Sequence, residues 1–179
     1  IKMWEAHPQL REMHIAVNVS VRQFHQPDFV EQVREVLKKT GAAPSRLKIE
    51  LTESVVLDNV SSAVAKMYDL KLLGVKFSMD DFGTGYSSLS YLTKLPLDQL
   101  KIDKSFVNNI SVKRSDAAIV QAIIGMAGSL DMEVIAEGVE TEAQRTFLEQ
   151  AGCMIYQGYL YSKPVPLEEF ENKVLQQFL

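Results

Sequence analysis

Short apolar or β-branched runs alternate with segments of helical periodicity six times along the chain. Such alternation predicts parallel strands joined by helical crossovers. The runs that we expect to be strands are 14–20, 47–53, 75–81, 100–107, 133–140 and 154–162. The expected helices are 3–13, 27–41, 60–74, 87–95, 115–131, 141–152 and 166–179. Gly41 is the expected helix stop, and Ser115 and Thr141 are the expected N-caps.

Nearly every expected strand carries a charged or amide residue close to its carboxyl end. In an open doubly wound sheet, ligand groups gather at one topological switch point, whereas a (β/α)8 barrel collects them from many strands onto one face. The pattern therefore favours an α/β fold of the (β/α)8 TIM-barrel type. The strand-end residues are Asn18, Glu50, Asp80, Asp81, Lys101, Asp103, Glu137 and Gln157.

The number of β/α units indicates whether the chain can form a complete barrel. Six units cannot close an eight-stranded barrel, so about two β/α units are expected to be absent. The chain begins with Ile1 and has 179 residues, which suits one domain better than two. We expect residues 1–179 to be a single domain that lacks its N-terminal part.

Composition excludes some classes of function. A net charge of −4 provides no general basic field, which argues against binding of duplex nucleic acid. The single cysteine, Cys153, cannot form an internal disulfide and is expected to be a buried small apolar group. No apolar run approaches the ~18 residues of a membrane-spanning helix. A cytoplasmic domain is therefore expected, with a longer parent protein that could still be tethered to a membrane.

The strand-end residues have the chemistry of a metal site. Asn and carboxylate oxygens suit Mg²⁺, Mn²⁺ or Ca²⁺ better than zinc. The adjacent Asp80 and Asp81 could serve two metal ions ~3.5–4 Å apart, the arrangement used for phosphoryl transfer. Lys101 would add a cation on the same face, able to neutralise a phosphate or hold a nucleophilic water. Gln157 could orient that water.

Each residue also has a structural interpretation. An Asp-Asp pair at a strand end is often a helix cap or a solvated turn, and Lys101 with Asp103 could be a structural ion pair. Glu137 could be a charge favoured by a helix dipole, and Gln157 could be structural. Recurrence at six strand ends favours the functional interpretation.

Six motifs, in order and over nearly the whole chain, resemble those of the EAL-domain cyclic di-GMP phosphodiesterases of bacteria. They are NVS at 18–20, ELTES at 50–54, DDFGTGYSSLSYL at 80–92, LKIDKSFV at 100–107, IAEGVET at 135–141 and QGYLYSKP at 157–164. The resemblance implies a barrel that hydrolyses cyclic di-GMP to linear pGpG with Mg²⁺ or Mn²⁺.

The resemblance also implies roles for single residues. Asn18, Glu50, Asp80 and Asp81 resemble metal ligands, with Asp80 as the bridge. Lys101, Glu137 and Gln157 resemble the catalytic residues around the water. Glu53 resembles the anchor of the loop that starts at Asp80, and this loop, together with the helix after it, resembles a homodimer interface.

One departure from the family pattern matters. The Glu-Ala-Leu segment that names the family, with its metal-binding glutamate, has no counterpart here. We therefore expect an active parent phosphodiesterase and impaired or no activity in these 179 residues alone. A sensory or GGDEF-type domain is a possible upstream partner in the parent.

Two other functions remain open from the sequence. One is a non-catalytic cyclic di-GMP receptor, and the other is a barrel aldolase with Lys101 as a Schiff base. The aldolase would need a neutral lysine, which the surrounding carboxylates oppose.

Overall fold

A computed structural model describes residues 1–57, 59–83 and 89–176. The elements along the chain are α1 (Lys2–Glu5), β1 (Ile15–Asn18), α2 (Val21–Phe24), α3 (Phe29–Thr40), η1 (Pro44–Arg46), β2 (Leu47–Thr52), α4 (Glu53–Leu57), α5 (Val60–Leu72), β3 (Lys76–Phe82), α6 (Leu89–Leu92), β4 (Gln99–Ile102), α7 (Lys104–Val107), α8 (Arg114–Ser129), β5 (Glu133–Ala136), α9 (Glu142–Gln150), β6 (Ile155–Tyr156) and α10 (Leu167–Gln176).

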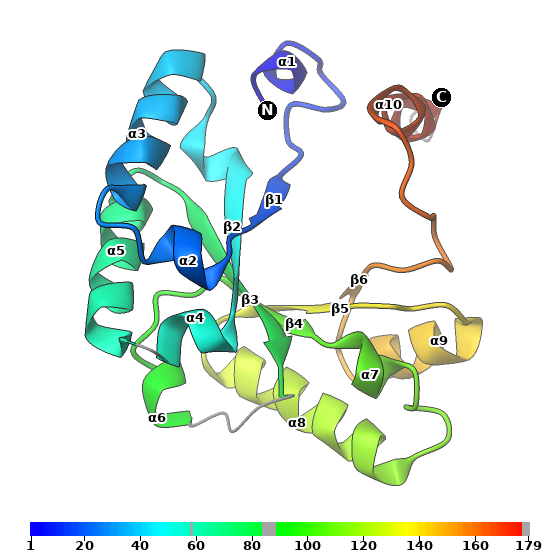
Figure 1. Cartoon of the computed structure of the whole chain (residues 1–179). Coiled ribbons are helices and arrows are strands. Elements are labelled where there is room, and N and C mark those ends of the chain that lie inside the picture. The colour runs from blue at the N-terminus through cyan, green and yellow to red at the C-terminus, as the bar shows by residue number, and fades with distance from the viewer. Residues whose placement is uncertain (58, 84–88, 177–179) are drawn as a thin grey trace.

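The strands form one parallel sheet in the order β1-β2-β3-β4-β5-β6 within the described residues. Figure 1 shows that the sheet curves, with α3, α5, α8 and α9 around its outer side and α1 and α10 across its inner side. β1 and β6 are the edge strands, and Val17 and Ile155 on them are exposed. The sheet is thus a half-barrel of β/α units, as the sequence predicts.

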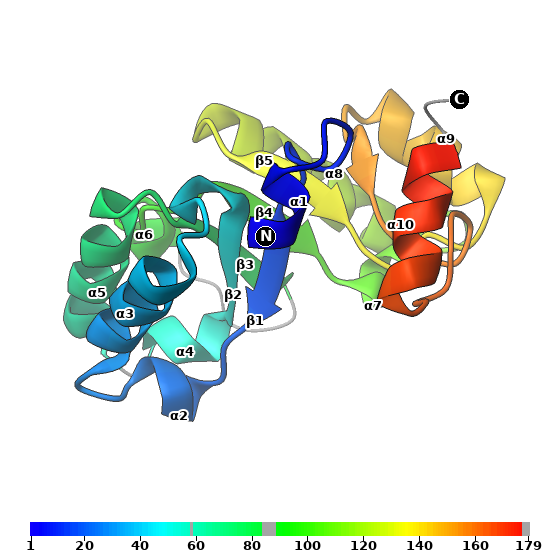
Figure 2. The same cartoon turned by 90° about the horizontal axis from the view of Figure 1, so that it is seen from above.

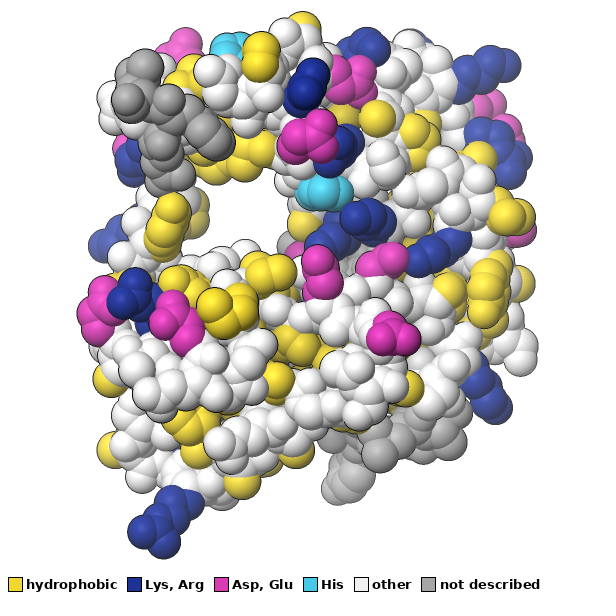
Figure 3. Space-filling model, turned by 180° about the vertical axis from the view of Figure 1, so that it is seen from behind, with side chains coloured by type: hydrophobic (Ala, Val, Ile, Leu, Met, Phe, Trp, Pro, Cys, Tyr) yellow, Lys and Arg dark blue, Asp and Glu magenta, His cyan; other side chains and the backbone are white. Residues whose placement is uncertain are grey.

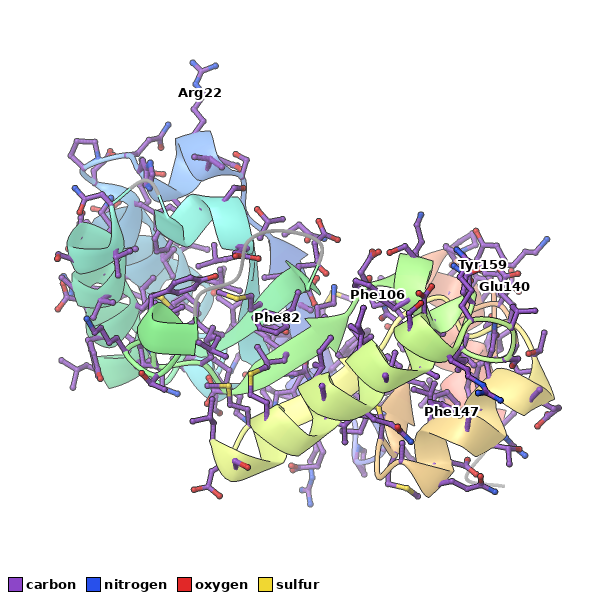
Figure 4. All side chains as sticks on the ribbon, turned by 90° about the horizontal axis from the view of Figure 1, so that it is seen from below. Arg22, Phe82, Phe106, Glu140, Phe147 and Tyr159 are labelled. Carbon is purple, nitrogen blue, oxygen red and sulfur yellow. The ribbon has the colours of Figure 1, made fainter. Side chains whose placement is uncertain are left out.

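Alternation along the strands separates an apolar outer face from a polar inner face. Ile49, Leu51, Phe77 and Met79 are at most 2% exposed and belong to the hydrophobic core. Because side chains alternate, Lys48, Glu50 and Thr52 face the opposite, inner side. Figure 4 shows Phe82 on β3 and Phe106 on α7, both beside α8. The core therefore lies between the sheet and its outer helices.

Local signals account for most element boundaries. Gly41 ends α3 in the left-handed conformation, with φ 64°. Thr141 caps α9 in a capping box with Gln144, as expected. The expected N-cap at Ser115 is wrong, because α8 begins at Arg114 with Lys113 in the cap position. The Ser115 hydroxyl instead donates to the carboxylate of its neighbour Asp116.

The expected first helix is much shorter than its pattern. Only Lys2–Glu5 is α-helical, and turns follow it. Pro8 explains the difference, because its ring disfavours helical geometry at His7. No helix in the part of the chain that the structure describes is long and apolar enough to cross a membrane.

Candidate active site

The ammonium group of Lys101 lies at the centre of the strand-end residues. The side chain is 5% exposed, and Nζ is 2.6 Å from Glu137 Oε1, 2.8 Å from Glu50 Oε2 and 3.2 Å from Asp80 Oδ1. These partners come from β2, β3 and the segment after β5. Figure 2 shows the arrowheads of β1, β2 and β3 pointing toward the side where α2 and α4 lie. Four of the sequence-predicted residues, Lys101 with its three partners, thus meet at the carboxyl end of the sheet.

A register shift explains how two adjacent aspartates fit at one strand end. Met79 pairs with Leu100 and Phe82 with Ile102, so Asp80 and Asp81 together stand opposite one residue of β4. Asp81 has a φ of 55°, and its amide donates to Asp80 Oδ1 over 3.0 Å. Such a bulge re-aims side chains that simple alternation would send to opposite faces.

Close packing of two loops brings Glu137 and Gln157 together. Gln157 Nε2 donates to Glu137 Oε1 over 2.7 Å. The Val139 amide donates to the carbonyl of Gln157, and the Gln157 amide donates to the carbonyl of Ala136. A Cβ on Gly158 would lie 2.1 Å from the Val139 carbonyl oxygen. Glycine is therefore required where the two backbones approach each other.

The electrostatics of the cluster follow from burial and mutual contact. Burial alone would lower the pKa of Lys101, but hydrogen bonds to Glu137 and Glu50 outweigh it and raise the pKa. Burial raises the pKa of Glu137 despite its hydrogen bond to Lys101. Burial, followed by the charge of Asp80, raises the pKa of Asp81. Lys101 is therefore firmly protonated, which is unsuited to a Schiff-base aldolase.

The donor chemistry fits a hard divalent cation. Three carboxylates converge on one point, and all their donor atoms are oxygens. Asn18 is in register with Glu50 on the neighbouring strand, which adds an amide oxygen at the same end. Within the described residues, no group of three or more His, Cys, Asp and Glu side chains is arranged as a metal site. Here the carboxylates contact Lys101.

The expected loop anchor, Glu53, is buried at the start of α4 and accepts a hydrogen bond from the Tyr91 hydroxyl over 2.5 Å. The contact joins α4 to α6, the helix after the loop. Loop positions 84–88 lie outside the described residues, so the anchoring and dimer roles stay predictions. Sequence reasoning missed Tyr91 because its pairing depends on the folded path of the chain.

Asp103 differs from the other strand-end residues. β4 ends at Ile102, and the Asp103 carboxylate caps α7 by accepting from the Ser105 amide over 2.9 Å. The ion pairs of Lys101 are with Glu50, Asp80 and Glu137. The sequence left open a structural ion pair between Lys101 and Asp103. The structure, which describes both residues, does not show this ion pair.

Comparison with known proteins identifies the relatives of this chain. A family model described as EAL domain matches residues 1–164. The chain is 44% identical over 166 residues to the cyclic di-GMP phosphodiesterase NbdA of Pseudomonas aeruginosa, covering 93% of this chain and 21% of that protein. The chain spans about a fifth of the length of the curated relatives it matches.

Solved structures agree in fold. The PaMucR phosphodiesterase in complex with c-di-GMP has a TM-score of 0.89 and 41% identity, covering 94% of this chain and 68% of that one. Klebsiella pneumoniae BlrP1 in complex with manganese and cyclic di-GMP has a TM-score of 0.81 and 32% identity, covering 91% of this chain and 42% of that one. A calcium complex of BlrP1 gives the same values.

Proposed function

Since this chain belongs to the EAL domain family, we propose that it carries the catalytic face of a metal-dependent phosphodiesterase that hydrolyses cyclic di-GMP to linear pGpG. The observation that carries the proposal is the convergence of Glu50, Asp80 and Glu137 on Lys101 at the carboxyl end of the half-barrel. NbdA and PaMucR, named as phosphodiesterases, support the choice of substrate.

The reaction adds water across one P–O bond of the substrate. The water oxygen bonds to phosphorus, the P–O bond to a ribose oxygen breaks, and that oxygen leaves as a hydroxyl after taking up a proton. In this proposal Lys101 would hold the attacking water and offset negative charge that develops on the phosphate. Gln157 holds Glu137 in position through its 2.7 Å hydrogen bond. Glu137 can then accept a proton from the water.

Asn18, Glu50, Asp80 and Asp81 are the residues that would hold Mg²⁺ or Mn²⁺. Bound divalent ions would lower the pKa of water and clamp the attacking and leaving oxygens. The manganese and calcium complexes of BlrP1 support divalent metal use in this fold. Glu53 would steady the loop after Asp80 through Tyr91.

The test is turnover of cyclic di-GMP with Mn²⁺ by wild type, Glu50→Ala and Lys101→Ala. We expect wild type to form the linear dinucleotide and both variants to lose at least ~100-fold in rate. We also expect a form extended at its amino terminus by two β/α units to be faster. Binding without turnover in both forms would overturn the proposal and favour a cyclic di-GMP receptor.

The family assignment also supports a proposal for the domain organisation and the oligomeric state. We propose that residues 1–179 form one domain that lacks its N-terminal part. We further propose that it acts as a cytoplasmic unit of a longer protein with a sensory or GGDEF-type domain. The fifth of the relatives' length that the chain spans supports this. A homodimer through the 80–92 loop and the following helix would be detected by sedimentation and lost on deleting that loop.

A further inference from the structure

Lys66 is a partly buried lysine of α5 whose ammonium group binds backbone rather than an acid. Its Nζ donates to the carbonyl of Phe24 over 2.8 Å and to the carbonyl of Gln26 over 2.7 Å. Nζ also lies 5.8 Å from the centroid of the buried Phe24 ring. Figure 3 shows several lysine and arginine side chains beside aspartate or glutamate on the rear face of the molecule. In contrast, Lys66 contacts no carboxylate in the described part of the chain.

The carbonyls that Lys66 binds lie at the end of α2, which is a single helical turn of four residues. The last carbonyls of a helix have no partner inside the helix. A lysine ammonium group at this end satisfies such carbonyls and complements the helix dipole. A helix this short is not stable alone, because helix nucleation is unfavourable. The position of α2 therefore depends on its contacts with the rest of the fold.

Two other sets of hydrogen bonds act on the same turn. Ser20 caps the start of α2 in a capping box with Gln23. His25 Nε2 donates to the Val55 carbonyl in α4 over 3.1 Å. The capping box lies within the turn itself, and α4 has only five residues. Lys66 is thus the hydrogen-bonding link between α2 and a long helix, the 13-residue α5.

α2 lies next to the candidate metal ligands. Only two residues separate it from Asn18, the last residue of β1. One of them, Val19, donates its amide to the carbonyl of Glu50 over 3.0 Å. α4 begins at Glu53, three residues after Glu50. Figure 2 shows α2 and α4 on the side toward which the strands point. A displacement of α2 would therefore reach Asn18 through two residues.

From these contacts, we propose that Lys66 is a positioning residue, which holds the end of α2 and thereby sets the place of the Asn18 side chain at the candidate metal site. A lysine suits this role because its three N–H donors can serve two carbonyls at once. Lys66 acts through α2 rather than on the substrate. The link to catalysis rests on the proposed function, whereas the effect on Asn18 can be measured without metal.

The first test compares wild type with Lys66→Met in the presence of a chelator. Methionine keeps the unbranched stem and removes the ammonium group. NMR follows the side-chain amide of Asn18, which Asn18→Ser assigns, and hydrogen exchange follows the Phe24 and His25 amides, which are bonded within the turn. We expect the Asn18 signal to move and the two amides to exchange at least ~tenfold faster, because charge-assisted hydrogen bonds are lost.

Lys71→Met is the matched control, because Lys71 is a partly buried lysine of the same helix. Its Nζ is 2.7 Å from Asp98 Oδ1, and Asp98 directly precedes β4 at the opposite end of the sheet. We expect Lys71→Met to leave the Asn18 signal and the exchange of α2 unchanged, even where it lowers the melting temperature. Lys66→Arg should restore much of the wild-type behaviour, because a guanidinium group can also donate to two carbonyls.

Mn²⁺ affinity, measured by electron paramagnetic resonance, separates this inference from the proposed function. We expect Lys66→Met to bind Mn²⁺ about tenfold more weakly than wild type, the low end of what supporting groups of a metal site contribute, and Lys71→Met to bind it equally well. If wild type bound no Mn²⁺, the proposed function would fail, and the Asn18 signal in chelator would still decide the role of Lys66. An unchanged Asn18 signal in Lys66→Met, an unchanged affinity where wild type binds Mn²⁺, or equal changes in Lys71→Met would overturn the inference.

Discussion

Replacing Lys101 with Met tests whether one ammonium group balances the carboxylates at the strand ends. Methionine keeps an unbranched apolar stem but leaves Glu50, Asp80 and Glu137 without their shared cation. Removing one partner of a buried ion pair costs about 3–5 kcal/mol. The three carboxylate side chains are 10–16% exposed, which lets water in and favours the low end, about 3 kcal/mol.

In a domain of this size, about 3 kcal/mol corresponds to a fall in melting temperature of roughly 6–12 °C. The assay is urea and thermal denaturation of wild type and Lys101→Met in a chelator at pH 7. The control is Lys173→Met, which removes an exposed ion pair with Glu169 and should change stability by at most ~0.5 kcal/mol. If Lys101→Met were as stable as this control, the balancing role would be refuted.

The pH dependence of the same variant has a defined sign. The pKa of Glu137 is already raised by burial, and Lys101 is the main group that opposes the rise. Without Lys101 the folded-state pKa should rise further. The folded state then disfavours the charged form of Glu137. The resulting loss of unfolding free energy is complete above the raised folded-state pKa of Glu137 and disappears below its ordinary pKa of 4.5. The difference in unfolding free energy between wild type and Lys101→Met should therefore become smaller as the pH falls from 7 toward 5.

Five further substitutions test the local structure. Gly158→Ala should lower the free energy of unfolding by about 1–3 kcal/mol and reduce turnover, because the added Cβ would overlap the Val139 backbone. Gly128→Ala should instead stabilise α8 by about 0.5–1 kcal/mol, because a Cβ at this position meets no atom within 4 Å. Thr141→Ala should cost about 1 kcal/mol through loss of a cap, and Ser115→Ala should cost far less; equal losses in urea denaturation would contradict the cap assignment. Tyr91→Phe should cost about 1.5–3 kcal/mol, because its hydroxyl donates to a buried carboxylate; an unchanged urea midpoint would argue against that hydrogen bond.

The sequence predicted six parallel strands and the chemistry gathered at their ends, because alternation and strand-end polarity are local signals. Two of the expected strands were too long: 100–107 is strand only to Ile102 and is followed by α7, and 154–162 is strand only at Ile155–Tyr156. It predicted the Thr141 cap correctly but not the start of α8, where Lys113 rather than Ser115 occupies the cap. Cap preference is a statistical signal and helix ends vary by a residue or two. The expected first helix was too long because Pro8 interrupts a pattern that periodicity alone extends.

The geometry of the site depended on features that no local pattern carries. The register shift that places Asp80 and Asp81 at one end arises from pairing between β3 and β4. The Glu53–Tyr91 hydrogen bond joins residues 38 positions apart. Residue types could be predicted, but their contacts required the tertiary fold.

The most direct test of the proposed function is a single-turnover reaction of cyclic di-GMP with Mn²⁺ in ¹⁸O-labelled water, analysed by mass spectrometry. It should be run on the 179-residue chain and on the form extended by two β/α units. Water attack at phosphorus predicts linear pGpG carrying one ¹⁸O atom in its terminal phosphate, and Glu50→Ala should abolish that product. Absence of labelled pGpG from both forms, or its undiminished formation by Glu50→Ala, would contradict the proposed hydrolysis at this cluster.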